Sequence, residues 1–156
     1  MSHSIKLLGH HRDLVPTVAR WHWDEWGADY PDSSLVEWTR QLAAKTNLDG
    51  LLCSWIAFVD ADPVGSVVVE LDGVEPRRDL KPDLAGLYVL PKYRNRGIGS
   101  ALVTACEAGA RRFGVRDLYL YTESAETLYA RLAWETIESC HFLGQAVAIM
   151  RKSLQL

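Results

Sequence analysis

The sequence predicts one α/β domain over residues 1–156, with a central sheet of mixed strand direction and helices on both of its faces. A chain of 156 residues can build one hydrophobic core but is too short for two ordinary domains. Segments with apolar residues at helical spacing alternate with apolar, β-branched runs of strand length. No internal repeat, low-complexity tract or linker divides them.

The first half of the chain is predicted to place two helices between a short strand and a hairpin. Leu14, Val18 and Trp21 recur at helical spacing, and Ser33 or Ser34 can cap the helix that follows. The segment from Asp60 to Pro63 is typical of a hairpin turn. The predicted elements are a strand at 5–8, helices at 13–26 and from the Ser33/Ser34 cap to 45, and strands at 51–59 and 64–71.

The second half begins with a polar loop and continues with alternating strands and helices. Asp72 to Asp83 is polar and contains two prolines, which is typical of a surface loop. Pro91 ends the next apolar run, and Gly114 follows a helical segment. The predicted elements are strands at 84–90 and 118–121, helices at 97–112 and 125–132, and a closing hairpin of 134–142 and 146–152.

Composition and charge exclude several classes of protein. A hydrophobic share of 48% and a charged share of 24% are typical of an ordinary folded domain and exclude a disordered one. The net charge of −3 argues against nucleic acid as a partner. The charge is nevertheless uneven, because residues 77–116 hold nine basic and three acidic side chains. Such a block indicates either an anion site or a solvated face.

The sequence predicts a cytoplasmic protein without a metal site or a membrane partner. The first thirteen residues contain no apolar run long enough for a signal peptide, and no stretch is long enough to span a membrane. Cys53, Cys106 and Cys140 are far apart, form no CxxC pair, and are predicted to be buried free thiols. No HExxH motif is present, so a catalytic metal has no support.

The stretch from Pro91 to Leu102 is the most informative motif. It begins where a predicted strand ends and runs directly into a helix, with glycines at positions 97 and 99. Unpaired amides at a helix N-terminus favour an anion such as a phosphate, and Arg94 and Arg96 add positive charge. A Walker loop would need a Gly-Lys-Ser/Thr ending, and a dinucleotide fingerprint a third small residue where Leu102 stands. Both nucleotide interpretations are therefore weakened.

Two blocks of the sequence resemble a known family. Arg94-x-x-Gly97-x-Gly99 after a strand, and the block from Thr122 to Trp134 with Leu128-Tyr129 at its centre, are similar to the two signatures of the GNAT superfamily of N-acetyltransferases. The resemblance implies a GNAT-like fold and acetyl-CoA as the acetyl donor. It implies that the pyrophosphate binds backbone amides of Asn95 to Ser100 and that the pantetheine arm lies along one strand. The cofactor-binding residues implied are Leu87, Tyr88, Val89, Arg94, Asn95, Arg96, Gly97, Ile98, Gly99 and Ser100.

The resemblance also implies an acid but leaves the base open. Tyr129 aligns with the family tyrosine that protonates the departing sulfur, although a buried helix aromatic is the alternative role. Thr122 and Ala133 stand where the family usually has Asn and Gly, and the change to Ala133 is expected to alter only local backbone freedom. The strand at 84–90 contains no carboxylate. Glu70 and Glu123 are the candidate bases, His141 is a weaker third, and a water chain or main-chain carbonyl can serve instead.

The acceptor is expected to be a primary amine of a small molecule or a peptide. In this fold the first two helices and their connecting loop border the acceptor, and here they are rich in aromatic and acidic residues. The candidate acceptor-binding residues are Trp23, Asp24, Trp26 and Tyr30. A non-catalytic acyl-CoA-binding or regulatory module is the competing function, and the oligomeric state is left open, a homodimer included.

Overall fold

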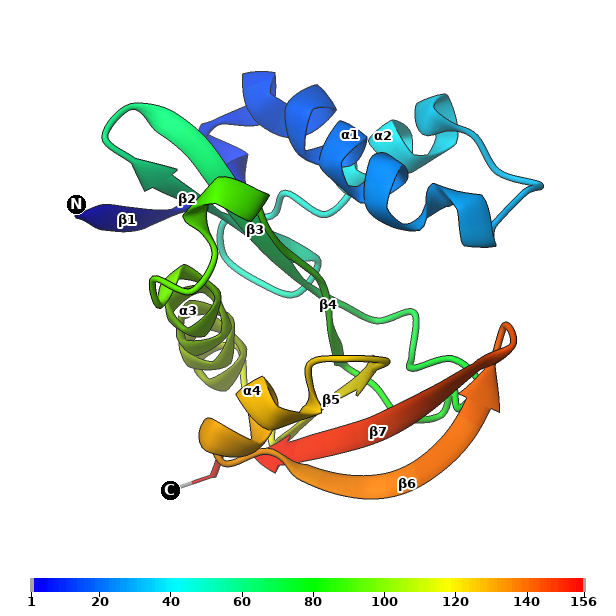
Figure 1. Ribbon diagram of the computed structural model, residues 1–156. Coiled ribbons are helices and arrows are strands. Elements are labelled where there is room, and N and C mark those ends of the chain that lie inside the picture. The colour runs from blue at the N-terminus through cyan, green and yellow to red at the C-terminus, as the bar shows by residue number, and fades with distance from the viewer. Residues whose placement is uncertain (1, 156) are drawn as a thin grey trace.

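The computed structural model describes residues 2–155 and contains a seven-stranded sheet between two layers of helices (Figure 1). The strands lie in the order β1-β2-β3-β4-β5-β7-β6, and all neighbours are antiparallel except β4 and β5. This confirms the predicted mixed sheet. The strands are β1 (His3–Leu7), β2 (Cys53–Val59), β3 (Asp62–Glu70), β4 (Asp83–Val89), β5 (Asp117–Thr122), β6 (Glu135–Phe142) and β7 (Gln145–Ser153). The helices are α1 (Val15–Trp26), α2 (Leu35–Ala43), α3 (Ile98–Arg112) and α4 (Glu126–Arg131).

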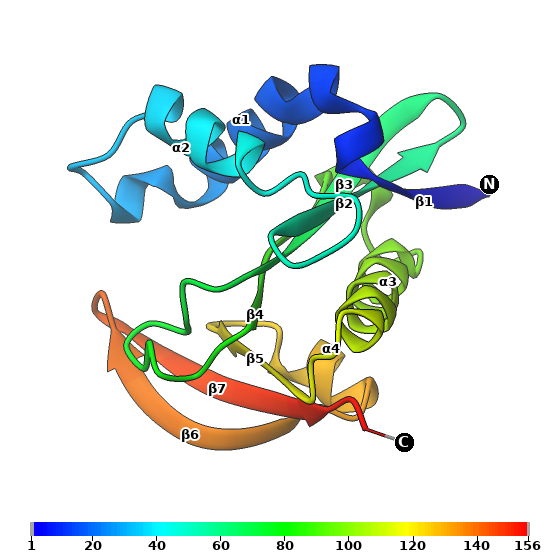
Figure 2. The same ribbon diagram turned by 180° about the vertical axis from the view of Figure 1, so that it is seen from behind.

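The helices cover opposite faces of the sheet, as Figures 1 and 2 show, with α1 and α2 on one side and α3 and α4 on the other. Successive residues of β3 point to the two faces. Val67 and Val69 belong to the core beneath α3, whereas Val68 belongs to the smaller core beneath α1 and α2. The three successive valines of β3, Val67 to Val69, are therefore all buried because both faces of the strand are covered.

Local signals explain where several elements begin and end. The Ser34 hydroxyl accepts a hydrogen bond of 3.1 Å from the Glu37 amide, which confirms Ser34 as the cap of α2. Helix α3 follows Gly97 and is itself followed by Gly114, and both glycines have positive φ, +83° and +87°. Val59 pairs with Asp62, so the turn between β2 and β3 has only Asp60 and Ala61 at its tip.

Three details differ from the sequence-based expectations. Strand β4 begins at Asp83, which was assigned to the preceding loop, because Asp83 pairs with Glu70 of β3 and extends the ladder past the apolar run. Ala133 has φ of +70°, a left-handed conformation that is strained for a residue with a Cβ, so its difference from the family glycine affects more than chain freedom. All three cysteines are free, as predicted, but Cys140 is only half-buried because it lies on the edge strand β6.

Two kinds of feature are absent from the described residues. No helix within residues 2–155 is long and apolar enough to cross a membrane. In the same part of the chain, no three His, Cys, Asp or Glu side chains come together as ligands for a metal ion.

Candidate functional site

The site is organised around the place where β4 and β5 separate. The two parallel strands share a single register pair, Asp83 with Tyr119, next to a hydrogen bond of 3.2 Å from the Tyr119 amide to the Pro82 carbonyl. Beyond that pair β4 has a partner only on its β3 side. One edge of the second half of β4, which includes the predicted residues Leu87, Tyr88 and Val89, is thus available for main-chain hydrogen bonds to a ligand.

The loop after β4 leads directly into the N-terminus of α3. Asn95 and Gly97 both have positive φ, +64° and +83°, and this turns the chain sharply before Ile98 begins the helix. No side chain caps the helix, and a Cβ built on Gly97 would meet nothing within 4 Å. The first amides of α3 therefore lie at an open position, where the helix dipole favours an anion.

Basic side chains surround this loop and are held by aromatic rings. Arg94 donates from Nε to the Val89 carbonyl at 2.8 Å, and its guanidinium lies 5.5 Å from the Tyr88 ring centre. Lys92 and Arg96 lie 5.1 and 5.6 Å from the ring centre of Tyr93. The predicted glycine loop and the predicted arginines thus form one positively charged region at the end of β4.

Helix α4 approaches the same loop from the other side of the opening. A Cβ built on Gly99 would lie 3.9 Å from Val89 Cγ2 and 4.0 Å from Leu128 Cδ2, so the start of α3, the end of β4 and the start of α4 converge there. Tyr129, the next residue of α4, is buried and packs edge-on against Trp134. Its hydroxyl forms no hydrogen bond with another residue in the described part of the chain. Burial raises the pKa of Tyr129 well above its usual value, so the phenol remains protonated.

A buried carboxyl pair lies at the opposite end of β4. Glu70 and Asp83 are cross-strand partners, and the Asp83 side chain accepts a hydrogen bond of 2.9 Å from the Gly73 amide. Glu70 forms an ion pair with Lys45, which also lies 3.0 Å from Asp72. Burial, followed by repulsion from Glu70, raises the pKa of Asp83 to about 8, and burial raises the pKa of Glu70 despite the attraction of Lys45. Of the two groups, Asp83 is the one whose pKa suits it to take up or release a proton near pH 8.

Asp83 is the functional candidate that sequence reasoning missed. The sequence pattern began this strand at Leu84 and so found no carboxylate on it. A signal was available, because Asp83 immediately precedes the apolar run. Glu123, the other candidate base, is exposed in the turn after β5, and His141 is exposed on β6.

Two of the four predicted acceptor residues lie beside β4 and β5. The Trp26 ring packs edge-on against Tyr88 at 6.2 Å between ring centres, and the Tyr30 hydroxyl lies 3.5 Å from that of Tyr121. The other two have different contacts. Trp23 packs against Trp38 of α2 at 5.4 Å, and Asp24 lies on the exposed side of α1, beside Arg20.

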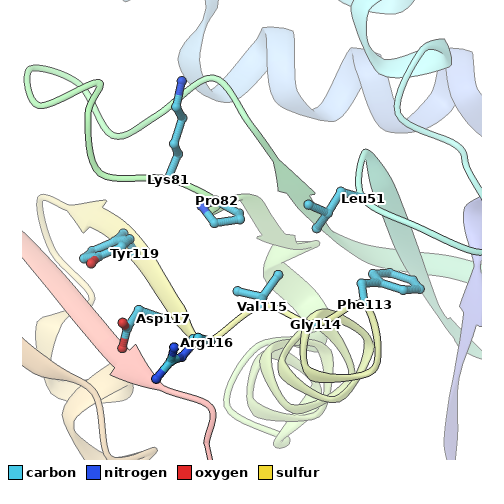
Figure 3. Close-up of a pocket in the computed structure, with 9 residues that line it drawn as sticks. All are labelled: Leu51, Lys81, Pro82, Phe113, Gly114, Val115, Arg116, Asp117 and Tyr119. Carbon is cyan, nitrogen blue, oxygen red and sulfur yellow. The ribbon is translucent and has the colours of Figure 1, made fainter.

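A separate hollow of about 380 Å³ lies at the far end of α3, beside the start of β5 (Figure 3). Lys81 and Arg116 line it, but Figure 3 shows their side chains pointing in opposite directions. Because its charges do not converge and it lies away from the glycine loop, this hollow is not part of the candidate site.

Comparison with known proteins agrees with this geometry. The model of the acetyltransferase (GNAT) family matches residues 15–135, a range that includes the glycine loop, β5 and α4. No curated protein matches the chain.

Solved structures of similar fold cover nearly the whole chain. An N-acetyltransferase from Staphylococcus aureus has a TM-score of 0.78 at 13% identity, covering 99% of this chain and 100% of its own. PaiA N-acetyltransferase from Thermoplasma acidophilum, solved with coenzyme A, has a TM-score of 0.65 at 22% identity, covering 98% and 99%. YncA from Salmonella typhimurium, solved with acetyl-CoA, has a TM-score of 0.74 at 14% identity, covering 100% and 96%. At these identities the likeness shows a shared fold.

Proposed function

Because the chain belongs to the acetyltransferase (GNAT) family, we propose that it transfers the acetyl group of acetyl-CoA to a primary amine of a small molecule or peptide. The observation that carries the proposal is the convergence of three features at one opening. These are the amides at the start of α3, the unpaired edge of β4, and the hydroxyl of the buried residue Tyr129, which has no hydrogen-bond partner among the described residues. A donor with an anionic end, an amide-containing arm and a thioester would use all three.

The donor is proposed to lie along β4 from the glycine loop inward. Amides of residues 95–100 bind its pyrophosphate, and the charges of Arg94 and Arg96 add attraction. Main-chain groups of Leu87, Tyr88 and Val89 pair with the amides of the pantetheine arm. The open surroundings of Gly97 support this placement, because a bulky phosphate can approach the backbone there.

The chemistry requires a protonated amine to lose two protons, one before its nitrogen attacks and one as the amide forms, and the sulfur to gain one. The amine nitrogen attacks the thioester carbonyl carbon, and the carbon–sulfur bond breaks as the tetrahedral intermediate collapses. Tyr129 acts as the general acid, donating from its phenol to the departing thiolate. The proton that the ammonium loses before attack passes through water to the Glu70–Asp83 pair, in which both pKa values are raised. The second nitrogen proton passes through water to the Tyr129 phenolate and restores the phenol. Glu123 is the alternative base, since it is exposed beyond β5.

The acceptor is proposed to be cationic before it reacts. Aromatic rings attract an ammonium group, and the rings of Trp26, Tyr30, Tyr88 and Tyr121 lie on elements that flank the opening. We base the acceptor site on Trp26 and Tyr30, because Trp23 and Asp24 have their contacts on α2 and on the outer face of α1.

The test measures release of free thiol from acetyl-CoA with a panel of amines, together with the mass of the acetylated product. Tyr129→Phe is compared with Tyr119→Phe, a matched change on β5 beside the separate hollow. We expect Tyr129→Phe to lower kcat roughly 10- to 100-fold and Tyr119→Phe to leave it unchanged. Binding of acetyl-CoA without product for any amine would overturn the proposal and identify a non-catalytic binding module. Equal kcat values for the two variants would remove Tyr129 from the mechanism.

A further inference from the structure

The middle of β4 contains a bulge that the sheet itself does not hold in place. Ser66 pairs with Tyr88 and Val68 with Ala85, so Gly86 and Leu87 together face the single residue Val67. Neither Gly86 nor Leu87 has a register partner on β3 or on β5. Gly86 has φ of +60°, which favours glycine. A bulge of this kind turns a peptide out of the ladder, and its direction must then be set by other groups.

Two buried side chains hold the carbonyl of this bulge, Ser66 by a direct hydrogen bond and His22 through a hydrogen bond to Ser66. Ser66 Oγ lies 3.0 Å from the Gly86 carbonyl oxygen and 2.8 Å from Nε2 of His22, which projects from α1. Ser66 is fully buried and His22 is 8% exposed. The Ser66 hydroxyl has one proton, which it donates to Gly86, so its oxygen accepts from Nε2–H of His22. Burial lowers the pKa of His22 to about 4, so the ring is neutral, as this arrangement requires.

The ring of His22 also lies close to the backbone of Gly86. A Cβ built on Gly86 would lie 2.9 Å from Cε1 and 3.2 Å from Nε2 of His22. The ring of His22 packs against Trp26, whose own ring contacts Tyr88. Helix α1 therefore contacts β4 at the bulge through three hydrogen-bonded groups, the His22 ring, the Ser66 hydroxyl and the Gly86 carbonyl. The ring of Trp26 packs against the His22 end of this chain.

The direction of the Gly86 carbonyl determines the direction of the next amide. In a planar trans peptide, the carbonyl of one residue and the N–H of the next point in opposite directions. With its carbonyl bound by Ser66, the Gly86–Leu87 peptide must aim the Leu87 N–H away from Ser66 and His22. That N–H lies on the half of β4 that has separated from β5.

We propose that His22 and Ser66 are positioning residues that orient the Gly86–Leu87 peptide so that the Leu87 N–H donates to the acetyl carbonyl oxygen. This rests on the proposed acetyl transfer. The carbonyl oxygen gains negative charge in the tetrahedral intermediate, and a donor that is already oriented stabilises that charge without reorganising. We call the hydrogen-bonded pair His22–Ser66 the clamp. The clamp connects α1 to the Gly86–Leu87 peptide and does not itself contact the acetyl group.

The test compares Ser66→Ala with Ser54→Ala, a matched change of a buried serine whose hydroxyl instead bonds the Lys45 carbonyl at 2.7 Å. We expect Ser66→Ala to lower kcat at least tenfold, with KM for acetyl-CoA and Kd for free CoA changing less than twofold. Ser54→Ala should leave kcat within twofold. A second pair is His22→Gln, which keeps a donor near Nε2, and His22→Leu, which does not; only His22→Leu should match Ser66→Ala.

An infrared measurement separates this inference from the proposed function. The thioester carbonyl band of ¹³C-labelled acetyl-CoA bound to the wild-type protein, without acceptor, should lie below its position in water and return toward it in Ser66→Ala. This readout needs no turnover, so it tests the clamp even if no amine is acetylated. Bands at the same position in both proteins, or equal kcat values for Ser66→Ala and Ser54→Ala, would overturn the proposal. If Ser66→Ala does not fold, the same band is measured in the two His22 variants. It should move toward its position in water in His22→Leu and stay near the wild-type position in His22→Gln.

Discussion

The two ends of β4 have opposite physical characters. At its C-terminal end the strand runs into an exposed, basic loop whose important groups are backbone amides. At its start the strand contributes Asp83, 4% exposed, to a carboxyl pair held by Lys45 from beyond α2. Backbone amides can bind an anion at an open position, whereas a carboxyl group acquires a pKa near neutrality only where water is excluded. The proposed anion site is therefore at the exposed end of β4, and the proposed proton-transfer pair is at its buried end.

The largest effect should come from blocking the loop end with Gly99→Glu. A Cβ at this position makes only ordinary contacts, at 3.9 and 4.0 Å, so the fold should persist while a carboxylate is placed among the amides. We expect the thermal stabilisation by saturating CoA to disappear, corresponding to a Kd at least roughly 100-fold higher. Gly50→Glu is the control, because a Cβ there meets nothing within 4 Å. Stabilisation of Gly99→Glu by CoA would show that the pyrophosphate binds elsewhere.

A change at the buried end should separate chemistry from binding. Asp83→Asn should lower kcat/KM roughly 100-fold and leave the Kd of CoA unchanged. With the pKa of Asp83 raised to about 8, the carboxylate form appears only as pH rises through that value, so wild-type kcat/KM should increase there and the variant should lose that increase.

Stability provides a second measurement on the same variant. Because the pKa of Asp83 is raised from 3.8 to about 8 in the folded state, folding favours its protonated form, and the resulting stability is lost progressively as pH rises from about 4 to about 8. Asn mimics the protonated form, so Asp83→Asn should keep its Tm at high pH. Asp62→Asn, an exposed position at the start of β3, is the control. If wild type and Asp83→Asn have the same dependence of kcat/KM and of Tm on pH, the base is another group.

A smaller effect should follow from removing one charge at the loop end. Arg94→Gln should raise KM for acetyl-CoA about tenfold, the size typical of one hydrogen bond to a charged group, and leave kcat unchanged. The difference from wild type should shrink as salt concentration rises. Arg20→Gln, which removes an exposed arginine of α1, should change neither constant. A fall in kcat with an unchanged KM would contradict this role for Arg94.

The smallest effect concerns the acceptor. Trp26→Leu should raise KM for a cationic amine about threefold, the size of one exposed cation–π contact, without changing KM for acetyl-CoA. Trp23→Leu should leave both KM values unchanged and lower Tm instead, because Trp23 packs between α1 and α2. A higher KM for the amine in Trp23→Leu, with no change in Trp26→Leu, would instead indicate an acceptor site beside α2.

Sequence reasoning succeeded where neighbours along the chain determine the structure. The loop from Arg94 to Gly99 was predicted correctly because a strand, a glycine turn and a helix N-terminus aim successive amides by local geometry alone. The same holds for the cap expected at Ser33 or Ser34, which is Ser34, and for the hairpin turn expected over Asp60 to Pro63, which has Asp60 and Ala61 at its tip. Hydrophobic spacing likewise predicted all seven strands and four helices, with boundary errors of a few residues.

Tertiary structure decided the groups whose chemistry depends on distant partners. Nothing near Asp83 in sequence indicates a raised pKa, because that shift requires the burial of Asp83 in the folded chain and the carboxyl group of Glu70 across the ladder. The same holds for His22 and Ser66, which are 44 residues apart and meet at a bulge that no local pattern predicts. Backbone amides are aimed by local dihedral angles, so the sequence by itself determined the proposed anion site. Proton affinity and the orientation of a bulged peptide depend on what packs around them, and only the folded chain brings those groups together.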